Sequence, residues 1–169
     1  MEEFKLIAKL ESLIKSRSKD VLVSIGDDTA VVKGSGAPLL CTVDSLVENV
    51  HFDLRYFSAA DLGHKALAVN LSDIAAMGGK PRWALVSLGL RKGVRTEFLM
   101  EMYRGLLALA LKHRVEVVGG NVSRANELFV DVTVIGEAPK RPVLRRGAKA
   151  GDLLAVTGFL GGAAGGLHG

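Results

Sequence analysis

The 169 residues are 49% hydrophobic and 24% charged, a balance typical of a compact globular domain and not of a disordered chain. No apolar run approaches the roughly 18 residues that a membrane span needs, and a net charge of +4 with 5% aromatic residues gives little support for nucleic-acid binding. The acidic start does not resemble a secretory signal, which predicts a cytoplasmic protein, and the single Cys41 is expected to be a buried small hydrophobe.

The first part of the chain is predicted to begin with a helix and continue with short strands. Apolar residues at helical spacing indicate the helix, and β-branched runs separated by turn residues indicate the strands. In chain order these are a helix from Glu2 to about Arg17, strands at 21–25 and 30–32 on either side of an acidic turn, and a strand at 39–43 that ends on Asp44.

A long helix is predicted next, from Ala59 to about Met77. Ser58 is expected to cap it, with Asp61 in the first turn, where the helix dipole favours an acid. The later elements are predicted in this order: a strand at 83–90, a helix at 97–113 capped by Thr96, a strand at 115–118 that enters a turn at 119–121, a strand at 128–135, and a last strand at 153–156. This pattern predicts an α+β fold, a mixed and mostly antiparallel sheet with helices packed on one face.

Several acidic residues occupy positions where an unpaired charge costs free energy. Asp27 and Asp28 lie between two apolar strands and Asp44 ends a third, while Asp73 continues an apolar helical stripe and is expected on the inner face of its helix. Asx-turn chemistry explains Asp27 and Asp28 as well, and a cap or a salt bridge to a lysine explains Asp73.

Taken together, these carboxylates favour a cage for a hard divalent cation such as Mg²⁺, which prefers oxygen ligands and bridges phosphates. Asn121 adds an oxygen after two glycines, where bare backbone can approach a phosphate. The sequence has no zinc-type histidine pair, no Gly-x-Ser-x-Gly elbow and no P-loop. Multi-metal phosphate chemistry is therefore the leading interpretation.

Four segments resemble, in order and spacing, the N-terminal motifs of the thiamine-monophosphate kinases. They are IGDDTA at 25–30, TVD at 42–44 followed by VHF at 50–52, VNLSDIAAMG at 69–78, and VGGN at 118–121. The third motif is similar across a wider superfamily that includes aminoimidazole ribonucleotide synthetase. The resemblance covers nearly the whole chain and implies transfer of the γ-phosphoryl group of ATP to thiamine monophosphate with Mg²⁺.

The resemblance also implies roles for individual residues. The magnesium ligands would be Asp27, Thr42, Asp44 and Asp73, with Asp28 and Asn121 as further candidates. Thiamine monophosphate would be contacted by His51, and ATP by Tyr103, Gly120, Asn121 and Arg145, or by Arg146 in a shifted register. Catalysis would involve Asp44, Asp73 and Asn121.

The resemblance further implies an N-terminal domain over residues 1–150, the start of a truncated C-terminal domain over 151–169, and a homodimer whose strands close an intersubunit barrel. It implies no nucleic-acid or membrane partner. Two alternatives stay open: another ATP-using member of the superfamily, such as aminoimidazole ribonucleotide synthetase, and a non-catalytic dimeric nucleotide-binding module.

Overall fold

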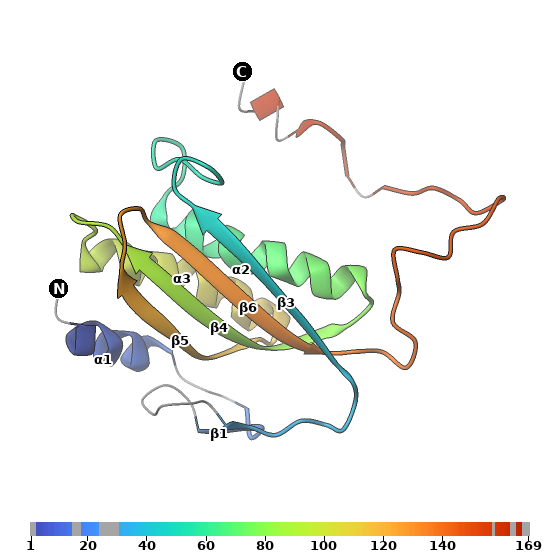
Figure 1. Ribbon diagram of the computed structural model, residues 1–169, viewed down its shortest axis with the longest axis horizontal. Helices are drawn as coiled ribbons and strands as arrows, with labels where there is room; N and C mark the ends of the chain where they lie inside the picture. The colour runs from blue at the N-terminus through green and yellow to red at the C-terminus, as the bar shows by residue number, and fades with distance from the viewer. Residues whose placement is uncertain (1–2, 15–17, 24–30, 157, 163–164, 167–169) are drawn as a thin grey trace.

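A computed structural model describes residues 3–14, 18–23, 31–156, 158–162 and 165–166 (Figure 1). The elements are α1 (Glu3–Leu13), β1 (Val21–Val23), β2 (Val31–Val32), β3 (Leu39–Val47), α2 (Ala59–Ala76), β4 (Lys80–Leu90), α3 (Thr96–His113), β5 (Glu116–Arg124) and β6 (Phe129–Glu137).

Four strands form the main sheet, in the order β3-β6-β4-β5. β6 pairs antiparallel with both β3 and β4, whereas β4 and β5 are parallel and are joined through α3. β1 and β2 form a separate antiparallel pair. The predicted α+β fold with a mixed, mostly antiparallel sheet is therefore confirmed.

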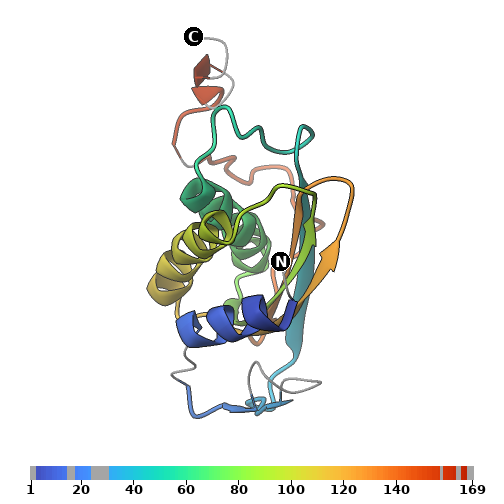
Figure 2. The same ribbon diagram turned by 90° about the vertical axis from the view of Figure 1, so that its left-hand side faces the viewer.

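The three helices lie on one side of the sheet, as Figure 2 shows. Alternate residues of the central strands face them, and those of β6 (Val130, Val132 and Val134) are fully buried. No described helix covers the opposite surface, which we call the open face. Odd-numbered residues of β3 point to the open face, so Cys41 is exposed and the prediction that it is buried is wrong.

The helices α2 and α3 pack so closely that glycine is required at the contact. A Cβ atom on Gly63 of α2 would lie 1.8 Å from the carbonyl oxygen of Met102, and one on Gly105 of α3 would lie 2.0 Å from that of Ala60. Both distances are far below van der Waals contact, so any side chain at either glycine would push the helices apart. This contact holds α2 firmly, and α2 carries much of the candidate site.

The predicted start of α2 is confirmed in detail. The Ser58 hydroxyl accepts a hydrogen bond from the Asp61 amide at 3.1 Å, and the Asp61 carboxylate accepts one from the Ser58 amide, which together make a capping box. The prediction that Thr96 caps α3 is wrong. Thr96 is the first helical residue there, and Arg95 is the N-cap without a side-chain hydrogen bond.

Two predicted boundaries differ from the structure because strand pairing extends past polar and glycine residues, and one predicted strand is absent. β3 continues to Val47, opposite Phe129 of β6, so Asp44 lies in mid-strand and does not end it. Gly119, Gly120 and Asn121 pair with β4 inside β5 and do not form a turn. The predicted strand at 153–156 is absent, since these described residues have no strand partner and follow an extended, exposed segment (Figure 1).

Candidate functional site

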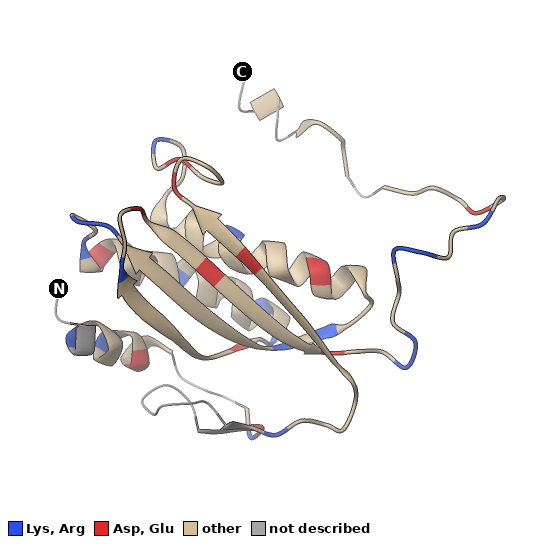
Figure 3. Cartoon of the chain, in the orientation of Figure 1, with Lys and Arg blue, Asp and Glu red and all other residues tan. Residues whose placement is uncertain are grey.

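Three of the predicted site residues, Thr42, Asp44 and Asp73, lie where β3, an edge strand of the sheet, runs beside α2. The Thr42 hydroxyl donates a hydrogen bond of 2.7 Å to a carboxylate oxygen of Asp73, across 31 positions in the sequence. Figure 3 shows acidic positions on both of these neighbouring elements. The structure therefore brings together two residues that the family resemblance implies as magnesium ligands.

Asp73 reaches this position from the margin of α2 and not from its inner face, so the prediction of an inner-face acid is wrong. Asp73 is exposed, and its partner is Thr42 instead of a lysine. The polar residue on the inner face is Asn70, which is fully buried and donates to the Ala66 carbonyl at 3.1 Å. With about 100° per helical residue, Asp73 lies roughly 60° around the helix from Asn70.

Asp44 lies two residues along β3 from Thr42 and faces the same way, toward the helices. Its carboxylate is half-buried. Thr42, Asp44 and Asp73 thus offer a hydroxyl and two carboxylates, all hard oxygen donors. In the part of the chain that the structure describes, no three His, Cys, Asp or Glu side chains converge on one point. The donor set nevertheless suits Mg²⁺, which commonly takes one or two carboxylates and completes its shell with water and substrate phosphates.

His51 lies on a tight turn that follows β3. Its Nδ1 accepts a hydrogen bond of 3.1 Å from the Val47 amide, and its own amide donates to the Val47 carbonyl at 2.9 Å. Because Nδ1 is an acceptor, the neutral ring carries its proton on Nε2. The side chain is exposed, so an outward-facing N–H donor is available to an anionic ligand.

A partly buried ion pair holds this turn to the rest of the fold. The Glu48 carboxylate accepts hydrogen bonds from Arg91 at 2.6 and 2.9 Å, and only 8% of Glu48 is exposed. The hydrogen bond from Arg91 lowers the pKa of Glu48 below its usual value, although burial opposes this. Asn49 adopts a left-handed conformation with φ of 63°, and Phe52 is buried. The backbone of the turn is therefore held by several contacts. An exposed histidine without a role would not need such a fixed backbone.

Gly120 and Asn121 lie elsewhere in the fold. Asn121 belongs to a polar row on the open face that runs through Ser87 and Asp131 to Ser45 on β3. β5 is three strand spacings from β3, about 14 Å, and the open face is opposite the side on which Asp44 and Asp73 lie. One copy of the chain therefore does not bring Asn121 to the Thr42–Asp73 pair. Glycine is required at position 120 for a structural reason, since a Cβ there would lie 1.8 Å from the Val86 carbonyl oxygen.

The other predicted residues are also apart from this pair. Tyr103 is 3% exposed within the core, where burial raises the pKa of its phenol. Arg145 and Arg146 are exposed on the extended segment after β6, which Figure 3 shows to be rich in basic positions. Asp27 and Asp28 lie outside the described residues. The roles of these five residues stay predictions.

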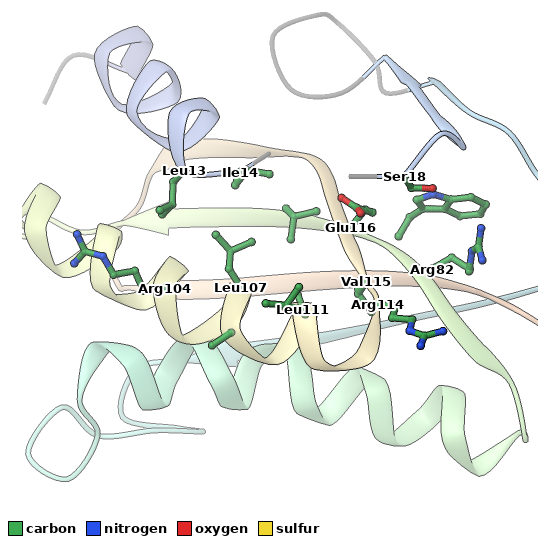
Figure 4. Close-up of a pocket in the computed structure, with 14 residues that line it drawn as sticks. Leu13, Ile14, Ser18, Arg82, Arg104, Leu107, Leu111, Arg114, Val115 and Glu116 are labelled. Carbon is green, nitrogen blue, oxygen red and sulfur yellow. The ribbon is translucent and has the colours of Figure 1, made fainter. Parts of the chain in front are cut away.

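A cavity of about 620 Å³ lies away from these residues, between the end of α1, α3 and the beginning of β5 (Figure 4). Its lining is largely apolar and includes Leu13, Leu107 and Leu111. Two of its arginines are already ion-paired, Arg82 with Asp20 and Arg104 with Glu101. The lining of this cavity includes neither Asp44 and Asp73 nor any residue of the His51 turn. The cavity is therefore not the site that the sequence predicts.

Residues 26–138 match the family described as AIR synthase related protein, N-terminal domain. The chain belongs to this family. The match includes Asp27, Asp28, β3, the His51 turn, α2 and β5, and it ends before Arg145.

Two relatives of the chain are named thiamine-monophosphate kinase. The chain is similar to the thiamine-monophosphate kinase of Bacillus subtilis strain 168, with 45% identity over 99% of this chain and 52% of the relative. It resembles the crystal structure of thiamine-monophosphate kinase from Stenotrophomonas maltophilia K279a, with a TM-score of 0.69, 35% identity, and coverage of 82% of this chain and 43% of that one.

A third comparison is with AaThiL complexed with AMPPCP and TMP, with a TM-score of 0.64, 39% identity, and coverage of 87% of this chain and 45% of that one. The chain spans about half the length of the relatives that it matches. Among the residues that the structure describes, none of the helices has the length and apolar character needed to cross a membrane.

Proposed function

We propose that this chain is the magnesium- and nucleotide-binding half of a thiamine-monophosphate kinase. The observation that carries the proposal is the 2.7 Å hydrogen bond between Thr42 and Asp73, which joins two of the implied metal ligands from distant segments. The 45% identity to the Bacillus subtilis kinase supports it, as does the similarity to AaThiL complexed with AMPPCP and TMP.

Magnesium would be held by Thr42, Asp44 and Asp73, with Asp27 and Asp28 as further ligands. The oxygen chemistry of the three described residues supports this assignment. Bound Mg²⁺ supplies positive charge that offsets the charge of the phosphates. By holding the ion, Asp44 and Asp73 would contribute to catalysis, because they would fix where that charge lies.

The reaction needs little proton chemistry from the protein. An oxygen of the thiamine monophosphate phosphate forms a bond to the γ-phosphorus of ATP, the bond to the β,γ-bridging oxygen breaks, and ADP leaves with that electron pair. Because the second pKa of a phosphate monoester is about 6, the attacking oxygen is already deprotonated near neutral pH. The task of the chain is to position two polyanions, and the His51 Nε2–H would donate a hydrogen bond to the acceptor phosphate.

The nucleotide contacts at Tyr103, Gly120, Asn121 and Arg145 belong to the same proposal. Because Asn121 lies on the open face, we propose that a second copy covers this face in a homodimer and completes the site. The open face supports this, since it exposes apolar side chains: Leu39 and Val43 of β3 are 52% and 60% exposed. A partner sheet would bury them and close the intersubunit barrel that the resemblance implies.

The division into domains is also proposed, with an N-terminal domain to residue 150 and a second domain from 151 onward. Beyond β6 the chain leaves the sheet, and Leu153 and Leu154 are almost completely exposed at 97% and 102%. Two adjacent leucines in this state favour burial against a further unit.

An ADP-release assay of the full-length gene product tests the proposed activity. With ATP and Mg²⁺, we expect ADP to form with thiamine monophosphate and not with formylglycinamidine ribonucleotide. Turnover only with the second compound would favour an aminoimidazole ribonucleotide synthetase, to which the family description also points. Absence of turnover with both would favour a non-catalytic nucleotide-binding module.

A further inference from the structure

Lys65 connects α2 to the His51 turn. Its ammonium group donates a hydrogen bond of 2.5 Å to the main-chain carbonyl of His51 and lies 5.0 Å from the centre of the Phe57 ring. We propose that Lys65 is a positioning residue that sets the His51 ring for the phosphate of the acceptor substrate. The inference rests on the proposed function for the role of His51, and it adds a residue that acts through His51.

The arrangement restrains a side chain that is usually mobile. A lysine on a helix surface loses up to about 2 kcal/mol of rotamer entropy when it is fixed, so a fixed ammonium needs partners. Lys65 has two, the His51 carbonyl and the face of Phe57, and its stem is half-buried. These contacts come from both ends of the loop between β3 and α2.

The position of Lys65 along α2 relates its contact with the His51 turn to the candidate metal ligands. Lys65 and Asp73 are eight residues apart on one helix, a distance of about 12 Å. At the Asp73 end, α2 is joined to β3 by Thr42; at the Lys65 end, it is joined to the His51 turn that follows β3. The helix therefore sets the distance between the candidate metal ligands and the group that would bind the acceptor phosphate.

The turn does not need Lys65 in order to fold. The Glu48–Arg91 pair, the Glu48 amide bonded to the Leu128 carbonyl at 2.9 Å, and the buried Phe52 hold its ends independently. Because His51 is exposed, water can replace the ammonium at its carbonyl. Loss of Lys65 should therefore loosen the orientation of the ring and leave the fold intact.

A double-mutant cycle in the full-length gene product tests this. We expect Lys65→Met to raise the KM for thiamine monophosphate about tenfold with little change in the KM for ATP, and to have no further effect in a His51→Ala background. Lys65→Arg, which keeps a cation, should restore most of the affinity. Lys112→Met, on the exposed last turn of α3, is the matched control. Additive effects of Lys65→Met and His51→Ala would overturn the proposal.

A second measurement does not depend on activity. Long-range ¹H–¹⁵N spectra of the histidine rings, with His51 identified by its absence in His51→Ala, should show the Nε2–H tautomer in the parent protein and shifted or broadened His51 signals in Lys65→Met alone. Unchanged His51 signals in Lys65→Met would overturn the inference. If the parent protein does not phosphorylate thiamine monophosphate, the proposed function fails, and these spectra still decide whether Lys65 positions His51.

Discussion

Glu48 is the most buried charged side chain among the described residues, and its partner Arg91 is more accessible. Paired in this way, the carboxylate stabilises the turn that presents His51. Hydrogen bonds to a charged group contribute about 1.5–3 kcal/mol, whereas an unpaired arginine at this partly exposed position costs less because water reaches it.

This pair predicts a pH dependence of stability. The folded-state pKa of Glu48 is lowered by Arg91, so its contribution to the free energy of unfolding is complete above the unfolded pKa and is lost as the pH falls through the lower folded value. We expect Glu48→Gln to destabilise the protein by about 1.5–3 kcal/mol near pH 7 and by much less at about pH 3.

Urea denaturation at the two pH values measures the difference. Glu127→Gln, at an exposed position before β6, is the control and should show no such change. A destabilisation by Glu48→Gln that is the same at both pH values would mean that the charge of Glu48 is not what holds the turn.

At single positions, the sequence predicted part of the site. The helical periodicity correctly identified the apolar stripe of α2 but placed Asp73 on it, because residues within about 60° of the stripe share its spacing. Asn70, at the centre of the buried arc, was missed because an amide carries no charge to mark it. The sequence did not predict the contact between Lys65 and the His51 carbonyl, since a bond to a main-chain carbonyl in a loop leaves no trace in residue type.

Local sequence signals predicted the helices well. They predicted the bounds of the strands less well. The cap at Ser58 and the first-turn Asp61 define the start of α2 within the sequence itself. The length of β3 depends on β6, which pairs with it as far as Val47, and this pairing joins segments far apart in the chain. Asp44 therefore lies in the middle of a strand, although aspartate is uncommon in strands.

The open face predicts how copies of the chain associate. Val43 is 60% exposed in β3, so Val43→Lys should leave the stability of one copy nearly unchanged while a buried lysine in the paired face prevents dimer formation. Leu111→Lys is the matched control, because Leu111 is 59% exposed but lies on α3, on the helical side of the sheet.

Sedimentation velocity of the full-length gene product distinguishes the two variants. We expect a dimer for the parent protein and Leu111→Lys, and a monomer for Val43→Lys. A dimer that survives Val43→Lys would place the subunit contact on another surface.

In the whole molecule, the predicted site residues fall into two separated sets. The candidate metal ligands and His51 lie along β3 and α2, whereas Gly120 and Asn121 lie on β5, whose residue 121 faces the open side. The order of motifs in the sequence predicted which residues belong together chemically. It did not predict this separation, because strand order and sheet faces are set by pairings between distant segments.

Isothermal titration calorimetry can show whether Asp73 and its neighbours bind the nucleotide through a metal ion, as we propose. In the full-length gene product, we expect AMPPCP to bind in Mg²⁺ and at least about tenfold more weakly in EDTA, with Asp73→Asn weakening the Mg²⁺-dependent binding. Because Asp73 is exposed and the change is isosteric, the melting temperature of Asp73→Asn without ligand should stay close to that of the parent protein. Equal affinity in Mg²⁺ and EDTA, or full affinity in Asp73→Asn, would contradict the account.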